Sequence, residues 1–166
     1  MGHRNLYSAH NTYGKRKTLR MEYIRTPPEI WQPLNKEFNF TVDACASDKN
    51  HLLPKYWTKE NSALDKDWDG EIVYCHPMYD VNIPKFVAKA FLHKCTTVFL
   101  LPASTNSIYF HTYFWDPIQH KFKDKVQVRF LPVNNRQLGY KMATDEGILP
   151  DRGYLRPLMI VVVNNI

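Results

Sequence analysis

The chain has 166 residues, of which 44% are hydrophobic, and a formal net charge of +6. A chain of this length buries about 70% of the surface that it exposes when unfolded, so we expect a single domain with a three-layer core. No apolar run approaches the roughly 20 residues that cross a bilayer, and the N-terminus carries charges where a signal peptide has its apolar segment, which predicts a cytoplasmic protein.

Most of the positive charge lies at the N-terminus. Residues 1–25 have a balance of +5, from Arg4, Lys15, Arg16, Lys17, Arg20 and Arg25 against Glu22. Tyrosines lie among these residues, and a mixture of basic and aromatic side chains suits phosphate contacts with occasional base stacking. A solvated end without fixed structure explains the same composition equally well. We divide the chain into a basic arm, residues 1–22, and a domain, residues 23–166.

Strand and helix patterns alternate along the domain. Residues 38–43 place apolar side chains at every second position and predict a strand that ends on a carboxylate. Residues 71–75 predict a second strand. Apolar residues then recur at helical spacing over residues 83–91. Pro84 is tolerated only in the first turn of a helix, so it fixes where this helix begins.

The next two elements are a strand and a helix. Residues 97–101 form a continuous apolar run, which predicts a buried strand that Pro102 ends. Thr105 or Asn106 is suited to cap a helix, which we expect to continue through an aromatic-rich segment to Trp115.

Two further strands are predicted towards the C-terminus, over residues 126–130 and 158–163. The element order therefore predicts an α/β fold with a mostly parallel sheet, helices on its faces and antiparallel strands at the C-terminal end. Residues 134–157 form a long polar loop, and a loop of that length within a domain usually binds a ligand or moves.

Cysteine and histidine spacing indicates neither a disulfide framework nor a metal site. The three cysteines, Cys45, Cys75 and Cys95, have no C-x-x-C spacing, so we expect reduced and mostly buried thiols. The seven histidines include no pair at H-E-x-x-H spacing, and we assign no metal.

Residues 72–80 are the most informative stretch of the chain. An apolar strand stops abruptly at the tetrad His76-Pro77-Met78-Tyr79. Ligands of open α/β sheets bind beyond the carboxyl ends of the strands, which is where this tetrad is predicted to lie. An ordinary turn at the end of a strand is the alternative reading of the same residues.

From Arg25 to about Tyr140 the chain resembles the phage-type, Dam-like DNA N6-adenine methyltransferases. The matching pieces, in order, are Thr26-Pro27-Pro28-Glu29-Ile30-Trp31 with Leu34, Phe40-Thr41-Val42-Asp43-Ala44-Cys45-Ala46 with Asn50, Tyr56-Trp57-Thr58, Ala63-Leu64 with Trp68, the His76 tetrad, Phe86-Val87 with Lys89-Ala90, Leu100-Leu101-Pro102-Ala103, and Arg136-Gln137-Leu138. The family has Asn or Asp, Pro, Pro and Tyr at the tetrad. The resemblance implies a Rossmann-like methyltransferase fold, S-adenosylmethionine as donor, and adenine N6 in double-stranded DNA as acceptor.

The resemblance assigns His76, Pro77 and Tyr79 to the catalytic site. The adenine N6 lone pair is delocalised, so two acceptors aimed at its hydrogens favour a pyramidal, nucleophilic nitrogen and stabilise the positive charge that develops. The family supplies a side-chain carbonyl and a neighbouring backbone carbonyl, and its tyrosine stacks on a flipped base. A neutral His76 offers one acceptor nitrogen and loses it on protonation, so activity is expected to fall near pH 6.5.

The donor pocket is predicted around Thr26, Pro27, Asp43 and Ala44. Asp43 matches the family carboxylate that pairs with the amino acid portion or hydroxyls of the donor, although the loop that follows contains no glycine. The alternative role for Asp43 is to cap a helix in the following segment.

DNA contacts are predicted from charge alone. Phosphate contacts from the arm and the long loop give affinity without sequence selection. The candidate side chains are Arg16, Lys17, Arg20, Arg136, Lys141 and Arg152. We expect a phage or prophage methyltransferase in a bacterial cytoplasm. A catalytically silent module that binds DNA or protein, and an enzyme acting on cytosine N4 or a modified base, are the alternatives.

Overall fold

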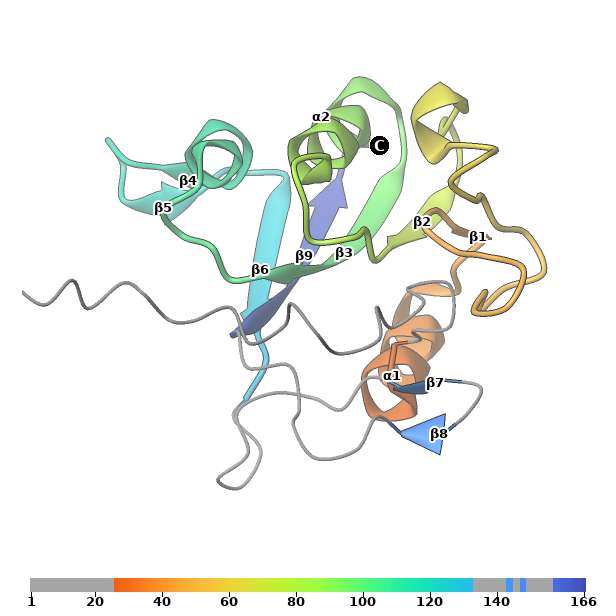
Figure 1. Cartoon of the computed structure of the whole chain (residues 1–166). Helices are drawn as coiled ribbons and strands as arrows, with labels where there is room; N and C mark the ends of the chain where they lie inside the picture. The colour runs from red at the N-terminus through yellow and green to blue at the C-terminus, as the bar shows by residue number, and fades with distance from the viewer. Residues whose placement is uncertain (1–25, 133–142, 145–146, 149–156) are drawn as a thin grey trace, which may run out of the picture.

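The computed structural model describes residues 26–132, 143–144, 147–148 and 157–166. Its centre is a five-stranded sheet in the order β1-β2-β3-β9-β6 (Figure 1). The strands are β1 (Val42–Asp43), β2 (Ile72–Cys75), β3 (Thr96–Pro102), β6 (Val126–Phe130) and β9 (Leu158–Asn164). β1, β2 and β3 run parallel, and β9 lies antiparallel between β3 and β6. The carboxyl ends of β1, β2 and β3 therefore meet at the same end of the sheet.

Helix α1 (Pro28–Phe38) covers one face of this sheet. Pro28 stands in its first turn, where the missing N–H has no partner to lose, and Asn39 ends it in the left-handed conformation with φ 54°. Ile30 and Leu34 are one turn apart and buried, so they attach the helix to the sheet. The core on this face consists of Ile30, Leu34, Phe40, Tyr74, Val98, Leu100, Leu158, Ile160 and Val162.

The opposite face is covered by α2 (Ile83–Leu92) and two short helical turns, η3 (Ala63–Asp65) and η4 (Phe110–Phe114) (Figure 1). Val87 and Ala90 of α2 are fully buried in this core. Trp68 is also fully buried, and its indole N–H donates to the Ala63 carbonyl at 2.9 Å, so the largest core side chain has its polar group satisfied.

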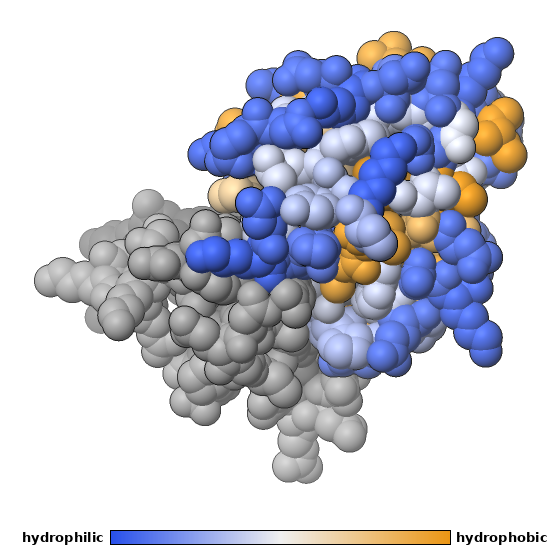
Figure 2. All heavy atoms as spheres, turned by 90° about the vertical axis from the view of Figure 1, so that its right-hand side faces the viewer, coloured by the Kyte–Doolittle hydropathy of each residue, from blue (hydrophilic) through white to orange (hydrophobic). Residues whose placement is uncertain are grey.

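Two small hairpins complete the described structure. They are formed by β4 (Trp115–Asp116) with β5 (Lys121–Phe122), and by β7 (Ala143–Thr144) with β8 (Gly147–Ile148). The molecular face on the β1 side of the sheet is mostly hydrophilic, with a smaller apolar area within it (Figure 2). Within the described ranges, no helix combines the length and the apolar character that a bilayer span requires.

The structure confirms the mixed α/β architecture and most of the predicted elements. The confirmed elements are the strands predicted at 71–75, 97–101, 126–130 and 158–163, and the helix predicted at 83–91. The antiparallel strand predicted at the end of the chain is β9, which lies inside the sheet rather than at its edge.

Two elements at the start of the domain differ from the sequence-based prediction. Helix α1 was not expected, and it extends to Phe38, so the strand predicted at 38–43 shrinks to β1. Of the alternating apolar residues, Phe38 ends α1, whereas Phe40 and Val42 are buried beyond it, and the rings of Phe38 and Phe40 stack at 5.7 Å. The helix predicted between Thr105 and Trp115 is present over residues 108–114, which include η4, and it begins slightly later than expected because residues 105–107 form a turn and a bend.

Candidate active site at the carboxyl ends of β1 and β2

The predicted crevice residues meet where β1 and β2 end. Asp43 at the end of β1 pairs in register with Tyr74 of β2, and the two strands are parallel. His76 follows β2 directly, two residues after Tyr74. Thr26 reaches the same place from the start of α1, since its hydroxyl contacts both Tyr74 and His76. Side chains from three separate segments of the chain are thus brought together.

A chain of hydrogen bonds runs through this site. The Thr26 hydroxyl oxygen lies 2.6 Å from the Tyr74 hydroxyl and 3.0 Å from His76 Nδ1. The other ring nitrogen, His76 Nε2, lies 3.0 Å from the Tyr79 hydroxyl. Thr26 and Tyr74 are buried, whereas His76 and Tyr79 are half-buried and face the crevice loop. Both nitrogens of the imidazole are therefore engaged within the protein.

Burial keeps His76 neutral. Loss of hydration lowers the pKa of its imidazole to about 4, and none of the carboxylates among the described residues opposes this shift. The ordinary histidine value of 6.5 that we used for the sequence-based pH dependence does not apply here. A pH profile between 6 and 8 does not titrate His76 and so does not test its role.

Asp43 is a buried carboxyl group that organises the loop after β1. Its two oxygens accept from the backbone N–H groups of Leu52 at 3.1 Å and Cys45 at 3.5 Å. Burial raises the pKa of Asp43 to about 6, although these two hydrogen bonds oppose the change. The alternative role as a helix cap is wrong, because turns and extended segments follow Asp43, and the next helical turn is η3.

The other residues predicted for the donor pocket lie around Asp43 and Thr26. Pro27 is buried, and its carbonyl accepts from Ile30 and Trp31 in the first turn of α1. Ala44 is buried, and its N–H donates to the Tyr74 carbonyl at 2.8 Å, which extends the pairing of β1 with β2. The predicted donor residues and His76 therefore occupy the same end of the sheet.

Comparison with known proteins identifies the family of this chain. Residues 15–165 match the family described as DNA N-6-adenine-methyltransferase (Dam). The chain belongs to this family. A DNA N-6-adenine-methyltransferase of Haemophilus phage HP1 is 28% identical over 90 residues, which are 51% of this chain and 52% of that protein. The chain therefore matches about half the length of this relative.

In this Dam-family protein, the loop between β2 and α2 brings apolar side chains to the surface. Met78 is 51% exposed and Val81 is 86% exposed. Tyr79 is half-buried and packs against the hydrophobic cores on both faces of the sheet, so it lies at the end of the sheet where these two cores meet.

Two cysteines lie at the same end of the sheet. Cys45 Sγ and Cys75 Sγ are 3.5 Å apart, and both thiols are free. Burial raises the pKa of Cys75 well above its ordinary value, so this thiol stays protonated. The expectation of mostly buried cysteines is confirmed, because Cys75 and Cys95 are buried and Cys45 is half-buried.

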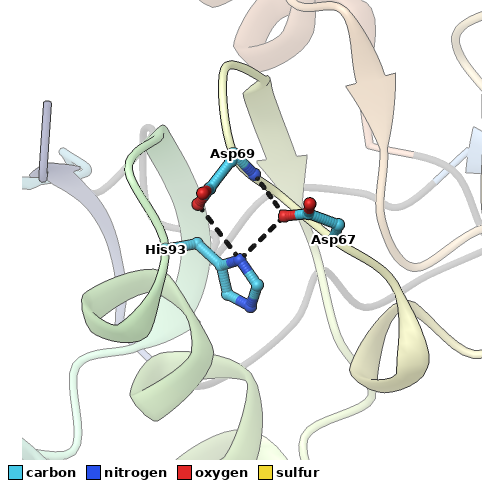
Figure 3. A group of neighbouring side chains, drawn as sticks. All are labelled: Asp67, Asp69 and His93. Carbon is cyan, nitrogen blue, oxygen red and sulfur yellow. Dashed lines mark hydrogen bonds and ion pairs between the residues drawn. The ribbon is translucent and has the colours of Figure 1, made fainter.

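A second polar cluster lies at the opposite end of the sheet, before β2 and β3. Asp67, Asp69 and His93 present ligand atoms within 4.8 Å of one another (Figure 3). His93 Nδ1 lies 3.1 Å from Asp67 Oδ1 and 3.2 Å from Asp69 Oδ1. The same oxygens accept backbone N–H groups of Asp69 and Lys94, so the cluster is explained by its role in shaping these two loops.

The six residues predicted to contact DNA lie outside the described residues. They are Arg16, Lys17, Arg20, Arg136, Lys141 and Arg152. Tyr74 is the site residue that the sequence analysis missed. The available signal was its hydroxyl in an otherwise apolar strand, two positions before His76 and hence on the same face.

Proposed function

We propose that this protein transfers a methyl group from S-adenosylmethionine to the N6 amine of adenine in double-stranded DNA. The observation that carries the proposal is the convergence of Thr26, Asp43, His76 and Tyr79 at the carboxyl end of the sheet. This is where an open α/β sheet binds its ligands. Family membership supports the same activity, and a Rossmann-like fold of the methyltransferase type is consistent with the mixed sheet.

The chemistry of the residues fits S-adenosylmethionine as the donor. When bound, this group supplies an electrophilic methyl on a sulfonium that carries positive charge. Asp43 is a buried carboxyl whose pKa of about 6 leaves it ionised at neutral pH, and a cationic or hydroxyl-bearing ligand would stabilise that charge. Thr26, Pro27 and Ala44 would line the pocket around it.

Tyr79 is the residue that we assign to the target base. Its position between the two core layers fixes the ring, and stacking on such a ring compensates for part of the cost of flipping a base out of the duplex. The neighbouring Met78 and Val81 form an apolar rim where the base would enter. His76 and Pro77 complete the catalytic loop.

DNA binding is assigned to the basic arm, residues 1–22, and to the basic residues of the long loop. The charge balance of +5 over residues 1–25 suits phosphate contacts along a duplex. Residues 23–166 would then form the methyltransferase domain. We expect a phage or prophage protein that acts in the cytoplasm of a bacterial host.

A catalytically silent DNA-binding module is the second candidate. The specific observation in its favour is that both nitrogens of His76 are already hydrogen-bonded to Thr26 and Tyr79. The family has an Asn or Asp side chain at this position, and either one presents a carbonyl oxygen.

Two measurements separate these candidates. Calorimetry with S-adenosylmethionine is expected to show binding by the wild type and weaker binding by Asp43→Asn. Asp124→Asn removes an exposed carboxylate that pairs with Lys121, and it serves as the matched control with unchanged affinity. A tritium-transfer assay on unmethylated DNA then tests the reaction. Donor binding without transfer to any DNA would establish the silent module, and transfer to DNA that lacks adenine would redirect the proposal to another amine.

A further inference from the structure

The Tyr74 hydroxyl sets the direction of the hydrogen-bond chain at the site. Tyr74 is 1% exposed, and burial raises the pKa of its hydroxyl well above the ordinary value, so the group keeps its hydrogen. Thr26 is its hydrogen-bond partner at 2.6 Å, with no second partner among the described residues. A buried hydroxyl hydrogen without an acceptor costs about 1–3 kcal/mol. Tyr74 therefore donates to Thr26.

Because Thr26 accepts a hydrogen bond from Tyr74, its own hydroxyl hydrogen is available for His76. A hydroxyl group has one hydrogen and can accept at its two lone pairs. One lone pair accepts from Tyr74, and the remaining partner within the described structure is His76 Nδ1 at 3.0 Å. Thr26 is itself 3% exposed, so its hydrogen has no access to water. Thr26 therefore donates to Nδ1, which must carry a lone pair.

The neutral imidazole of His76 therefore carries its single N–H hydrogen on Nε2. A neutral histidine has one protonated nitrogen, and Nδ1 is the acceptor. Nε2–H then donates to the Tyr79 hydroxyl oxygen, 3.0 Å away. The ring centroids of His76 and Tyr79 are 5.5 Å apart at an interplanar angle of 46°, so this hydrogen bond fixes the Tyr79 ring relative to the end of β2.

We propose that Thr26 and Tyr74 are positioning residues that hold His76 as the Nε2–H tautomer, and that His76 donates to Tyr79 instead of accepting from the target amine. The imidazole thus gives its N–H to Tyr79 and has no free lone pair for the target amine, which is the reverse of the acceptor expected from the sequence. The second part of the proposal rests on the proposed function. The amine hydrogens would then be accepted by the His76 and Pro77 carbonyls, because the Met78 carbonyl accepts from Asp80 N–H at 2.8 Å.

The tautomer is measured directly by ¹⁵N resonances of the imidazole at pH 7 in histidine-labelled full-length protein. His76→Gln identifies the signals of His76 among the seven histidines. The expected wild-type spectrum has a protonated Nε2 and an unprotonated Nδ1. A wild-type His76 signal with protonated Nδ1 would overturn the assignment, whether or not the Thr26 and Tyr74 variants fold.

The role of the two hydroxyl groups is tested by substitution. Thr26→Val removes the hydroxyl at nearly constant volume and is expected to raise the population of the Nδ1–H form, whereas Thr26→Ser keeps the hydroxyl and should preserve the wild-type spectrum. Tyr74→Phe keeps the ring and provides a second test, with a rise of the Nδ1–H form expected. Unchanged tautomers in Thr26→Val and Tyr74→Phe would refute the positioning role.

This experiment separates the inference from the proposed function. A wild-type Nε2–H tautomer in a protein that transfers no tritium to DNA supports the hydrogen-bond assignment and refutes the methyltransferase activity. Transfer by a protein whose wild-type imidazole is protonated at Nδ1 supports the activity and refutes the inference.

Discussion

Asp43 and His76 lie at the same end of the sheet, and folding shifts their pKa values in opposite directions. The pKa of Asp43 rises and the pKa of His76 falls. Asp43→Asn and His76→Gln are therefore expected to change the pH dependence of the free energy of unfolding in opposite directions. Each substitution replaces an ionisable side chain by an amide that keeps some hydrogen-bonding capacity. The two pKa shifts are independent of each other, because His76 is not among the groups that shift the pKa of Asp43, and Asp43 is not among those that shift the pKa of His76.

The magnitudes follow from the two pKa values. The pKa of Asp43 rises from 3.8 to about 6 on folding, so its protonated form stabilises the fold at low pH and this stability is lost as pH rises through 6. The pKa of His76 falls from 6.5 to about 4, so its contribution is present above pH 6.5 and is lost as pH falls through 4. At about 1.4 kcal/mol per pH unit, Asp43 contributes about 3 kcal/mol. Half-buried His76 contributes about 2–3 kcal/mol after screening.

Urea unfolding at several pH values between 4 and 7 measures these contributions. Relative to the wild type, as pH rises from 4 to 7 the free energy of unfolding of Asp43→Asn should rise by about 2 kcal/mol, and that of His76→Gln should fall by about 2–3 kcal/mol. The comparison with the wild type cancels titrations that all three proteins share, such as that of Glu37 beside Arg129. Differences that stay flat with pH, or that have the same sign, would refute the assigned burial of these groups.

Three further predictions concern ligand binding. S-adenosylmethionine affinity, measured by calorimetry, should fall about tenfold per pH unit below pH 6 as Asp43 is protonated. Asp43→Asn should remove this pH dependence. A wild-type affinity that is constant from pH 5 to 7 would contradict the role of Asp43 in donor binding. Tyr79→Ala should reduce methyl transfer to DNA by about tenfold or more, because stacking is worth about 1–3 kcal/mol per base, whereas Tyr79→Phe keeps the stack; equal losses in both variants would argue against stacking. Deletion of residues 1–20 should flatten the slope of log affinity for DNA against log salt, and an unchanged slope would show that the arm does not contact phosphates.

The sheet and α2 were predictable because their buried residues form continuous apolar runs or an apolar pattern at helical spacing. β3 and β9 are buried along nearly their whole length and appear as continuous apolar runs. α2 combines an apolar stripe with Pro84 in its first turn, so both its position and its start could be read. The end of β2 was equally clear, because the apolar run stops at His76.

Helix α1 was not predictable by the same reasoning. It fully buries only Ile30 and Leu34, while Trp31 and Phe38 are half-buried against the same core. Pro33 lies inside the helix, where proline removes a backbone donor and normally argues against helix formation. Packing of Trp31 against Phe40 and Tyr74, at centroid distances of 5.4 and 4.9 Å, stabilises the helix through residues that follow it in the chain.

The hydrogen bonds of His76 could not be predicted from its neighbours in the sequence. Its Nδ1 partner, Thr26, lies fifty positions earlier and reaches the end of β2 because α1 folds back over the sheet. The sequence supplied the residue types at the site but not which nitrogen of the imidazole faces which hydroxyl. That arrangement changes the expected role of His76 from acceptor to donor.

The opposite pKa changes of Asp43 and His76 have a common consequence for the charge of the crevice. At neutral pH Asp43 is ionised and His76 is neutral, so these two groups give the site one negative charge. A sulfonium donor is cationic, and a protonated imidazole nearby would offset the attraction of Asp43 for it. Burial of His76 against Thr26, with no carboxylate partner in the part of the chain that the structure describes, prevents that offset down to about pH 4. The pH sensitivity of donor binding is thereby assigned to Asp43, which loses its charge near pH 6, well before His76 gains one.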